Sequence, residues 1–156
     1  MLGLWHFSFT VSNLDEAVDF YVDLLGCTLV HKQSQDNAYT RSLVGYPDAD
    51  LRIAQVRIGD GGSLSSHDLE LVQYVVPRGA RGDINICNPG AAHLAFAVED
   101  LDFEYARLTA KGIPFFSAPN RITAGVNAGG AAVYFHGPDD IVHELVQPPR
   151  HAPAAR

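Results

Sequence analysis

The sequence has little of several features that mark common protein classes. It contains only two cysteines, Cys27 and Cys87, and neither belongs to a CxxC spacing. This argues against a disulfide framework or a cysteine zinc site, and it fits a reducing cytoplasm. No apolar run reaches membrane-spanning length. The start MLGLWHFSFTV lacks the basic residues and long apolar stretch of a signal peptide, so we interpret it as a strand.

Positive charge is scarce as well. The chain has 11 Lys and Arg against 18 Asp and Glu, which gives a formal net charge of -7 and a pI near 5.3. Nucleic acids and acidic membranes select basic surfaces, so we expect neither as a partner. Hydrophobic residues are abundant at 47%, enough for a packed core in one domain or two small halves.

The chain contains an internal repeat, because two motifs recur in the same order. The recurring motifs are WHFSFTVSNLD (5–15) with AHLAFAVEDLD (92–102), and ELVQ (70–73) with ELVQ (144–147). This alignment matches His6 with His93 and Glu70 with Glu144. Either match alone could be chance, but the shared order indicates a duplicated unit.

Each half is predicted to run strand, helix, then three strands. The predicted strands are 4–11, 27–33, 50–58, 68–76, 91–98, 114–117, 131–136 and 141–147, and the predicted helices are 13–25 and 100–111. Asn13 with Glu16 forms a capping box, and Gly26 ends the first helix. Asp100 and Gly112 bracket the second helix in the same way.

These elements define the expected domain organisation. We expect a first module at 1–76, a linker at 77–90, a second module at 91–147 and a loose tail at 148–156. The first half is longer, and we expect its extra residues to lie in loops within 34–50 and 59–67. The second of these, GDGGSLSSH, is a candidate lid by composition and position.

Strand alternation gives the first strand of each half one fully apolar face, expected to pack on the helix. The opposite faces carry His6, Ser8 and Thr10 in the first strand and His93, Ala95 and Ala97 in its repeat. The small residues beside each histidine leave open space above the sheet. Glu70 and Glu144 also lie in strands, and a carboxylate inside an apolar strand is costly unless it is paired or metal-bound.

The repeat turns two histidines and two glutamates into equivalent positions. Taken singly, each residue would more often be structural or exposed than a ligand. Imidazole and carboxylate together suit Zn, Ni, Co, Mn or Fe rather than a calcium cage. We therefore predict one divalent metal site made of His6, Glu70, His93 and Glu144, which converge if the halves pair about a pseudo-twofold axis.

Other polar residues are weaker candidates for the site. Tyr134 and His136 share one face of a strand, and substrate contact and a structural role are equally expected for them. Arg52 and Arg121 could bind a carboxylate or phosphate of the substrate, although exposed arginine is the commoner outcome.

The remaining polar neighbours of the ligands are assigned by position. His143 is adjacent to Glu144 and should therefore face away from the metal. Asp68 shares strand parity with Glu70 and could support the ligands through hydrogen bonds. Three histidines are expected at the surface: His31, His67 and His151.

With these motifs the sequence resembles the vicinal oxygen chelate superfamily, over about residues 4–147. The resemblance rests on three motifs: WHFSFTVSNLDEAVDFYVDLLG, AHLAFAVEDLD and YFHGPDDIVHELVQP. The resemblance implies an α+β fold of two tandem βαβββ modules that form a cupped mixed sheet around a metal. By position, the family's ligands fall on His6, Glu70, His93 and Glu144.

Within that superfamily two groups look most similar. The His/Glu/His/Glu set looks most like glyoxalase I. The segments AVYFHGP and HELVQPP and the long linker look closer to methylmalonyl-CoA epimerase, which typically has Gln where Glu70 stands. The usual DPDGN turn before the last glutamate is replaced by GPDDI at 137–141.

The resemblance implies a small substrate that chelates the metal through neighbouring oxygens, and a homodimer. We hypothesise that Glu144 or Glu70 is the general base of an isomerase, epimerase or lyase that moves a proton next to a carbonyl. One alternative is an Fe(II) dioxygenase, which uses two histidines and one glutamate. Another is a non-catalytic drug-binding resistance protein, which usually lacks the ligand set. The residues identify neither the metal nor the substrate, and the modules could pair within one chain or between two.

Overall fold

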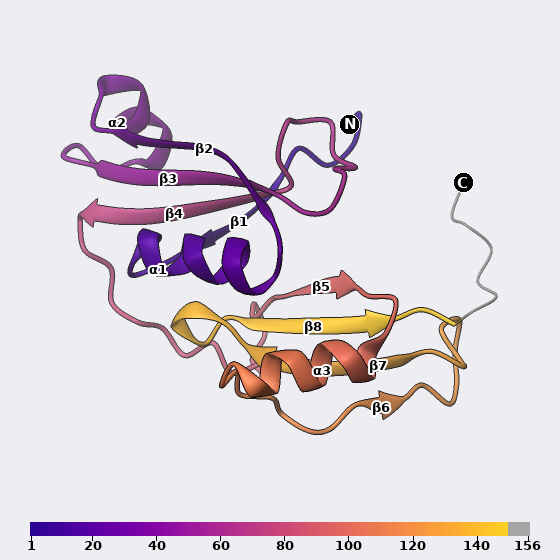
Figure 1. The fold of residues 1–156 in the computed structure, drawn as a ribbon. Coiled ribbons are helices and arrows are strands. Elements are labelled where there is room, and N and C mark those ends of the chain that lie inside the picture. The colour runs from indigo at the N-terminus through magenta and orange to yellow at the C-terminus, as the bar shows by residue number, and fades with distance from the viewer. Residues whose placement is uncertain (150–156) are drawn as a thin grey trace. The chain divides into compact units, whose positions relative to one another are not determined.

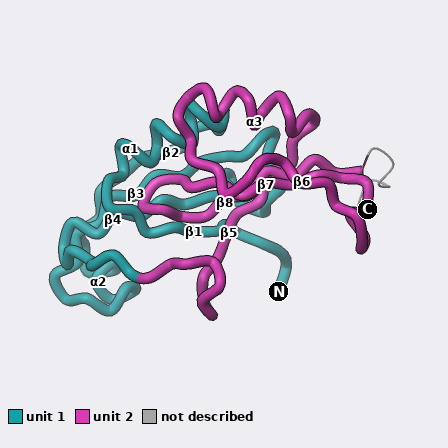
Figure 2. The backbone as a smooth tube through the Cα atoms, turned by 90° about the horizontal axis from the view of Figure 1, so that it is seen from below, with its two compact units in different colours: residues 1–82 teal, residues 83–156 magenta. Residues whose placement is uncertain are grey.

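The computed structural model describes residues 1–149 and shows the same strand order twice (Figure 1). The chain divides into two units, Met1–Gly82 and a second that begins at Asp83 (Figure 2). This boundary falls inside segment 77–90. Within the described residues, no helix has both the length and the apolar character needed to cross a membrane.

Unit 1 is a four-stranded mixed sheet with the order β1-β4-β3-β2. Its elements are β1 (Phe7–Thr10), α1 (Leu14–Asp19), the π-helical η1 (Phe20–Leu24), β2 (Thr28–Gln35), α2 (Ala38–Val44), β3 (Asp50–Arg57) and β4 (Leu69–Val76). β1 pairs in parallel with β4, and the other pairings are antiparallel.

Unit 2 repeats this arrangement with the order β5-β8-β7-β6. Its elements are β5 (His93–Ala97), α3 (Leu101–Ala110), β6 (Asn120–Arg121), β7 (Ala131–His136), the 3-10 helix η2 (Pro138–Asp140) and β8 (Val142–Gln147). β5 pairs in parallel with β8, as β1 does with β4. The predicted α+β modules are therefore confirmed.

The two main helices begin at the residues that the sequence indicates. The Asn13 side chain accepts hydrogen bonds from the backbone at the start of α1, and Asp100 accepts one from the Phe103 backbone at the start of α3. Gly26 and Gly112, which follow these helices, both have a positive φ angle, which glycine adopts without strain. The capping side chains and the glycines together fix where each helix begins and ends.

In unit 1, one face of the sheet packs against α1. Leu69 and Leu71 of β4 are fully buried on this face, together with Leu14 and Ala17 of α1. Because side chains alternate along β4, Glu70 lies on the opposite face. A third layer covers part of that face, where Val44 of α2 packs against a buried cluster. The cluster comprises Leu51, Ile53 and Val72.

One loop prediction and one strand prediction differ from the structure. Segment 34–50 was expected to be irregular, but it contains α2, whose start is capped by the side chain of Asn37. Segment 114–117 was expected to be a strand, but Phe115 makes only an isolated bridge to Phe135. The edge strand of unit 2 is instead β6, two residues long. Helix α2 has only 7 residues and segment 114–117 is shorter still, so their hydrophobic pattern carries little periodic signal.

Two element boundaries also differ. The predicted helix 13–25 changes from α to π geometry at Phe20, and the amide of Leu25 donates to the carbonyl of Phe20. The predicted strand 4–11 begins only at Phe7. His6 therefore lies just before β1, where its position depends on tertiary contacts as well as on strand pairing.

Candidate metal centre

Unit 1 brings the first predicted ligand pair together. His6 Nε2 lies 3.8 Å from Glu70 Oε1, and both side chains are partly exposed. Glu70 is opposite Ser8 in the β1–β4 register, so a small hydroxyl residue stands beside the carboxylate. The small residue that the sequence places beside this histidine therefore stands next to Glu70 in the sheet.

Unit 2 brings the second predicted pair together in the same way. His93 Nε2 lies 3.2 Å from Glu144 Oε2. Glu144 is opposite Ala95 in the β5–β8 register, which is the position equivalent to Ser8 in unit 1. Each unit therefore presents one imidazole and one carboxylate on the face of its sheet that is opposite the main helix.

A third donor group in unit 1 corrects a prediction. His67 was expected at the surface, but only 3% of it is exposed. Its Nε2 lies 3.2 Å from His6 Nδ1, and the two ring centroids are 5.0 Å apart. Burial lowers the pKa of His67, and the neighbouring His6 lowers it further. His67 is therefore neutral near pH 7, with ring nitrogens able to accept a hydrogen bond or bind a metal.

Sequence reasoning missed His67 because it precedes the strand that carries Glu70. β4 begins only at Leu69, so alternation along the strand does not predict where His67 points. Together His6, His67 and Glu70 offer ligand atoms that lie within 4.8 Å of one another. Histidine within three residues of a predicted ligand is the sequence signal that could have found it.

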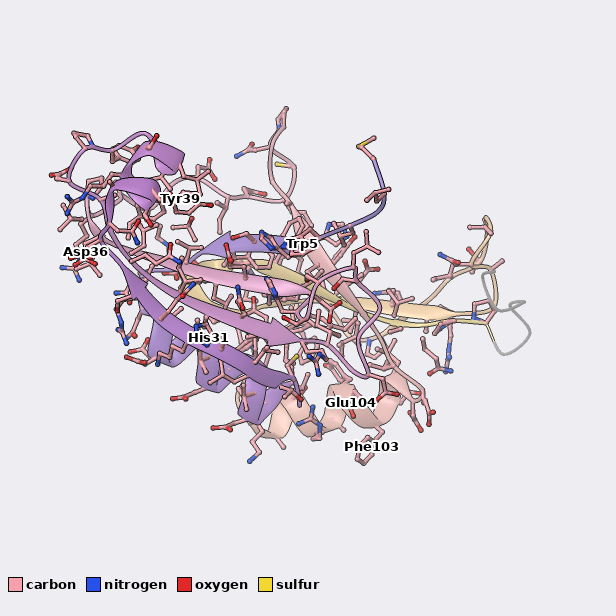
Figure 3. All side chains as sticks on the ribbon, turned by 90° about the horizontal axis from the view of Figure 1, so that it is seen from above. Trp5, His31, Asp36, Tyr39, Phe103 and Glu104 are labelled. Carbon is pink, nitrogen blue, oxygen red and sulfur yellow. The ribbon has the colours of Figure 1, made fainter. Side chains whose placement is uncertain are left out.

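The other surface predictions have separate outcomes. His31 lies on β2 and is exposed, as predicted (Figure 3). His151 falls outside the described residues. Asp68 directs its carboxylate to the backbone amide of Ile58 at 2.9 Å, and this hydrogen bond is the largest factor that lowers its pKa. Asp68 therefore anchors the start of the 59–67 loop.

The 59–67 loop is held by hydrogen bonds rather than left free as a lid. The Ser65 hydroxyl donates to the backbone carbonyl of Trp5 at 2.6 Å, and the amide of Leu64 donates to the carbonyl of Leu4. The Ser63 hydroxyl donates to the carbonyl of His67 at 2.8 Å. The interpretation of this loop as a lid is not supported by these contacts.

Tyr134 and His136 lie on the Glu144 face of β7. Tyr134 is directly opposite Glu144 in the register, and its ring centroid lies 5.2 Å from that of His93. Burial raises the pKa of the Tyr134 hydroxyl, and the nearby Glu144 carboxylate adds to this effect. His136 packs against the ring of Phe116 at 4.4 Å. Substrate contact by these two residues stays a prediction.

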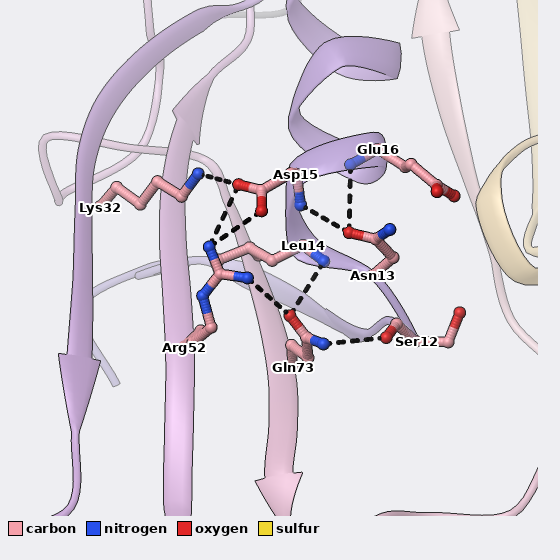
Figure 4. Close-up of polar contacts among 8 residues, drawn as sticks. All are labelled: Ser12, Asn13, Leu14, Asp15, Glu16, Lys32, Arg52 and Gln73. Carbon is pink, nitrogen blue, oxygen red and sulfur yellow. Dashed lines mark hydrogen bonds and ion pairs between the residues drawn. The ribbon is translucent and has the colours of Figure 1, made fainter.

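The two predicted substrate-binding arginines lie on the other face, beside the helices. Arg52 Nη2 donates to both carboxylate oxygens of Asp15, and Nη1 donates to Gln73 Oε1 at 3.3 Å (Figure 4). Arg121 pairs with Asp102 at 3.4 Å in the equivalent place in unit 2. The structure places neither arginine on the sheet face that carries Glu70 or Glu144. Each arginine is instead paired with an aspartate at the start of a helix.

His143 faces away from Glu144, as strand alternation predicts. It is fully buried, its ring stacks on Phe96 and lies against Phe135, and its Nδ1 donates to the carbonyl of Ile141 at 2.9 Å. Burial lowers its pKa to about 4, an effect that the hydrogen bond to Ile141 only partly opposes. His143 is therefore a neutral core residue.

The donor chemistry of these residues fits a first-row divalent metal. Each unit offers an imidazole nitrogen and a carboxylate oxygen that are partly exposed rather than buried in the core. Neutral imidazole and carboxylate are ligands that Zn, Ni, Co, Mn and Fe accept. The residues present thus pass the chemical test for a metal site in each half.

Comparisons with known proteins agree with this arrangement. A protein from Actinomyces sp. named 2-epi-5-epi-valiolone epimerase is 35% identical over 156 residues, which cover 97% of this chain and 82% of that protein. A glyoxalase family protein from Bacillus cereus has a TM-score of 0.79 at 22% identity and covers 96% of this chain and 95% of its own.

A more distant structure has the same fold. The trypanothione-dependent glyoxalase I of Leishmania major matches with a TM-score of 0.63 at 19% identity, over 92% of this chain and 85% of its own. The family model described as the Glyoxalase/Bleomycin resistance protein/Dioxygenase superfamily matches residues 3–145. With two βαβββ units, a repeated histidine–glutamate pair and a match over nearly its whole length, the chain belongs to this superfamily.

Proposed function

We propose that this protein is a divalent-metal-dependent epimerase that moves a proton at a carbon next to the carbonyl of a small oxygen-chelating substrate. The observation that carries the proposal is the equivalent histidine–glutamate pair in each unit. The 35% identical epimerase supports this reaction over the lyase reaction that the same ligand set would also permit.

The proposed metal ligands are His6 and Glu70 from one unit and His93 and Glu144 from the other. When bound, a divalent metal would act as a Lewis acid that polarises the substrate carbonyl and acidifies the neighbouring C–H bond. The two carboxylates do the proton chemistry in this proposal.

Epimerisation requires a proton to leave one side of a carbon and return on the other. One carboxylate, Glu144 or Glu70, takes the proton as the C–H bond breaks and the electron pair moves toward the carbonyl oxygen. The other carboxylate, once protonated, returns a proton to the opposite side. No net oxidation or reduction occurs, so no redox partner is needed.

The surroundings of the two carboxylates support small-molecule binding. Ser8 and Ala95, both small residues, stand opposite them in the strand register. Tyr134, directly opposite Glu144, places a hydroxyl on the same face, where it can hydrogen-bond a substrate oxygen. In unit 1, the buried Ile53 and Val72 lie on the Glu70 face and pack against Val44 and Tyr74.

The test is exchange of the substrate proton with solvent. We expect the metal-loaded protein to introduce deuterium from D2O next to the carbonyl of 2-epi-5-epi-valiolone, the substrate named for the relative. Glu144→Gln and Glu70→Gln should each lower this exchange at least about 100-fold while metal still binds, since general acid–base groups contribute on that scale. Glu16→Gln, an exposed glutamate on α1, is the matched control. Full exchange in both variants would rule out the proposed bases.

One observation favours a second candidate, an Fe(II) dioxygenase. His6, His67 and Glu70 form a set of two histidines and one carboxylate within unit 1. That ligand set leaves open positions for oxygen and substrate in non-haem iron enzymes. Tightly bound iron together with substrate-dependent oxygen consumption would favour this candidate over the epimerase.

A further inference from the structure

We infer that His67 is a positioning residue that holds the His6 ring in the orientation and tautomer needed to bind the metal. The inference rests on the proposed role of His6 as a metal ligand. It assigns His67 to a hydrogen bond behind the ligand and not to the metal itself.

The two nitrogens of His6 face different partners. Nε2 points to the Glu70 carboxylate at 3.8 Å, which is too long for a hydrogen bond. Nδ1 lies 3.2 Å from His67 Nε2, within hydrogen-bond range. If Nδ1–H of His6 donates to His67, the Nε2 lone pair remains free on the side of the carboxylate. Metal-binding histidines generally fix their tautomer through such a bond at the other nitrogen.

His67 is itself fixed in place. Its ring is buried, and Nδ1, its second nitrogen, has no hydrogen-bond partner among the described residues. Among the described residues, the hydrogen bond to His6 is thus the hydrogen bond that the His67 ring makes. An unsatisfied buried nitrogen costs stability, so its presence in a core position calls for a functional reason.

The loop before β4 ties His67 to the segment that carries His6. The Ser65 hydroxyl donates to the carbonyl of Trp5 and accepts the backbone amide of His67. Trp5 directly precedes His6 in the chain. The serine-rich loop, which lengthens the first half relative to the second, therefore fixes both histidines through one set of hydrogen bonds.

Unit 2 has no equivalent of His67 within its described residues. The residue three positions before Glu144 is Ile141, which is buried and apolar. The ring next to His93 is that of Tyr134, in an edge contact at 75°. The positioning hydrogen bond is therefore a property of the first half alone, and its loss should affect His6 and spare His93.

The first experiment measures zinc affinity by competition with a coloured chelator. We expect His67→Ala to weaken zinc binding about 10–100-fold, the usual effect of removing a hydrogen-bond partner of a metal ligand. His67→Gln should recover much of this loss, because its side-chain carbonyl can accept the His6 Nδ1–H. His31→Ala, which removes an exposed histidine of the same unit, should leave the affinity unchanged.

The second experiment locates the imidazole protons in the zinc-loaded protein by long-range 1H–15N NMR. We expect zinc on Nε2 of His6, a proton on its Nδ1, and no zinc on His67. Zinc bound directly to His67, or wild-type affinity in His67→Ala, would overturn the inference.

These results separate the inference from the proposed function. If His67→Ala weakens zinc binding but the wild-type protein exchanges no substrate proton, the positioning role stands and the epimerase proposal fails. If Glu144→Gln abolishes exchange while His67→Ala binds zinc normally, the epimerase proposal stands and the positioning role of His67 fails.

Discussion

His67 and His143 show how a partner decides the role of a buried histidine. Both are at least 97% buried, and burial is the main factor that lowers the pKa of each. His143 bonds to a backbone carbonyl of its own hairpin and stacks on Phe96, so it serves the core. His67 bonds to a proposed metal ligand, so it serves the site.

The buried His143 predicts acid sensitivity of the fold. Its pKa is the ordinary 6.5 in the unfolded chain and about 4 in the folded protein. As pH falls, the unfolded chain takes up the proton first, so the stability from neutral His143 is complete above pH 6.5 and declines toward pH 4. We expect the free energy of unfolding to fall by about 2 kcal/mol between pH 7 and pH 5 from this group.

Denaturant unfolding at both pH values measures this loss. In His143→Asn the amide can still donate to the carbonyl of Ile141 but does not titrate. The variant should therefore lose clearly less stability than the wild type over the same pH interval, whatever its absolute stability. An equal loss in the two proteins would show that His143 is not the responsible group.

At the scale of elements, the repeated ELVQ motif performs two tasks on two faces of one strand. Glu70 and Gln73 are three positions apart in β4 and so point to opposite faces. The glutamate faces the site, whereas Gln73 Oε1 accepts the backbone amide of Leu14 at the start of α1 (Figure 4). Gln147 accepts the amide of Leu101 at the start of α3 in the same way. The helix N-terminus, which leaves amides unpaired, is thus satisfied from the last strand of each unit.

This contact predicts the effect of removing the glutamine. Gln73→Ala should lower the free energy of unfolding by about 1–2 kcal/mol, because the variant loses the bond to Leu14 and the bond to the carbonyl of Ser12. Gln147→Ala should have a similar effect through Leu101. Chemical denaturation of each variant checks this.

Gln33→Ala is the matched control for the glutamine variants. Its side chain bonds only weakly to the exposed His31, at 3.4 Å. We expect a change within about 0.5 kcal/mol. If the control and Gln73→Ala are equally destabilised, the helix contact is not the cause.

At the scale of the whole molecule, the proposed metal ligands come as one histidine–glutamate pair from each unit. Each unit has its own sheet and its own histidine–glutamate pair. A metal held by all four ligands would bind the native chain and not the unfolded one. Metal binding should therefore stabilise the complete protein by mass action.

Metal removal tests this coupling. At a free metal concentration about 100 times Kd, we expect loading to raise Tm by about 5–10 °C over the chelator-treated protein. His93→Ala should bind less metal by elemental analysis and show a smaller shift. An identical Tm with and without metal in the wild type would contradict metal binding by the folded protein.

The local sequence by itself determined the repeat, the main elements and the faces of the strands. Alternation along β4 and β8 was enough to place Glu70 and Glu144 opposite the buried leucines, because side-chain direction in a strand has a period of two. The helix caps at Asn13 and Asp100 were also readable, because a capping side chain bonds to amides only two or three residues away.

Only the tertiary structure decided which distant groups meet. The Ser65 hydroxyl reaches Trp5 across 60 residues of sequence, and this contact places His67 behind His6. Arg52 pairs with Asp15 on the helix face, although its charge alone was equally consistent with substrate binding. Such contacts depend on loop paths and packing that have no periodic signature in the sequence. The pattern therefore indicated the proposed ligands, and the fold alone placed His67 beside one of them.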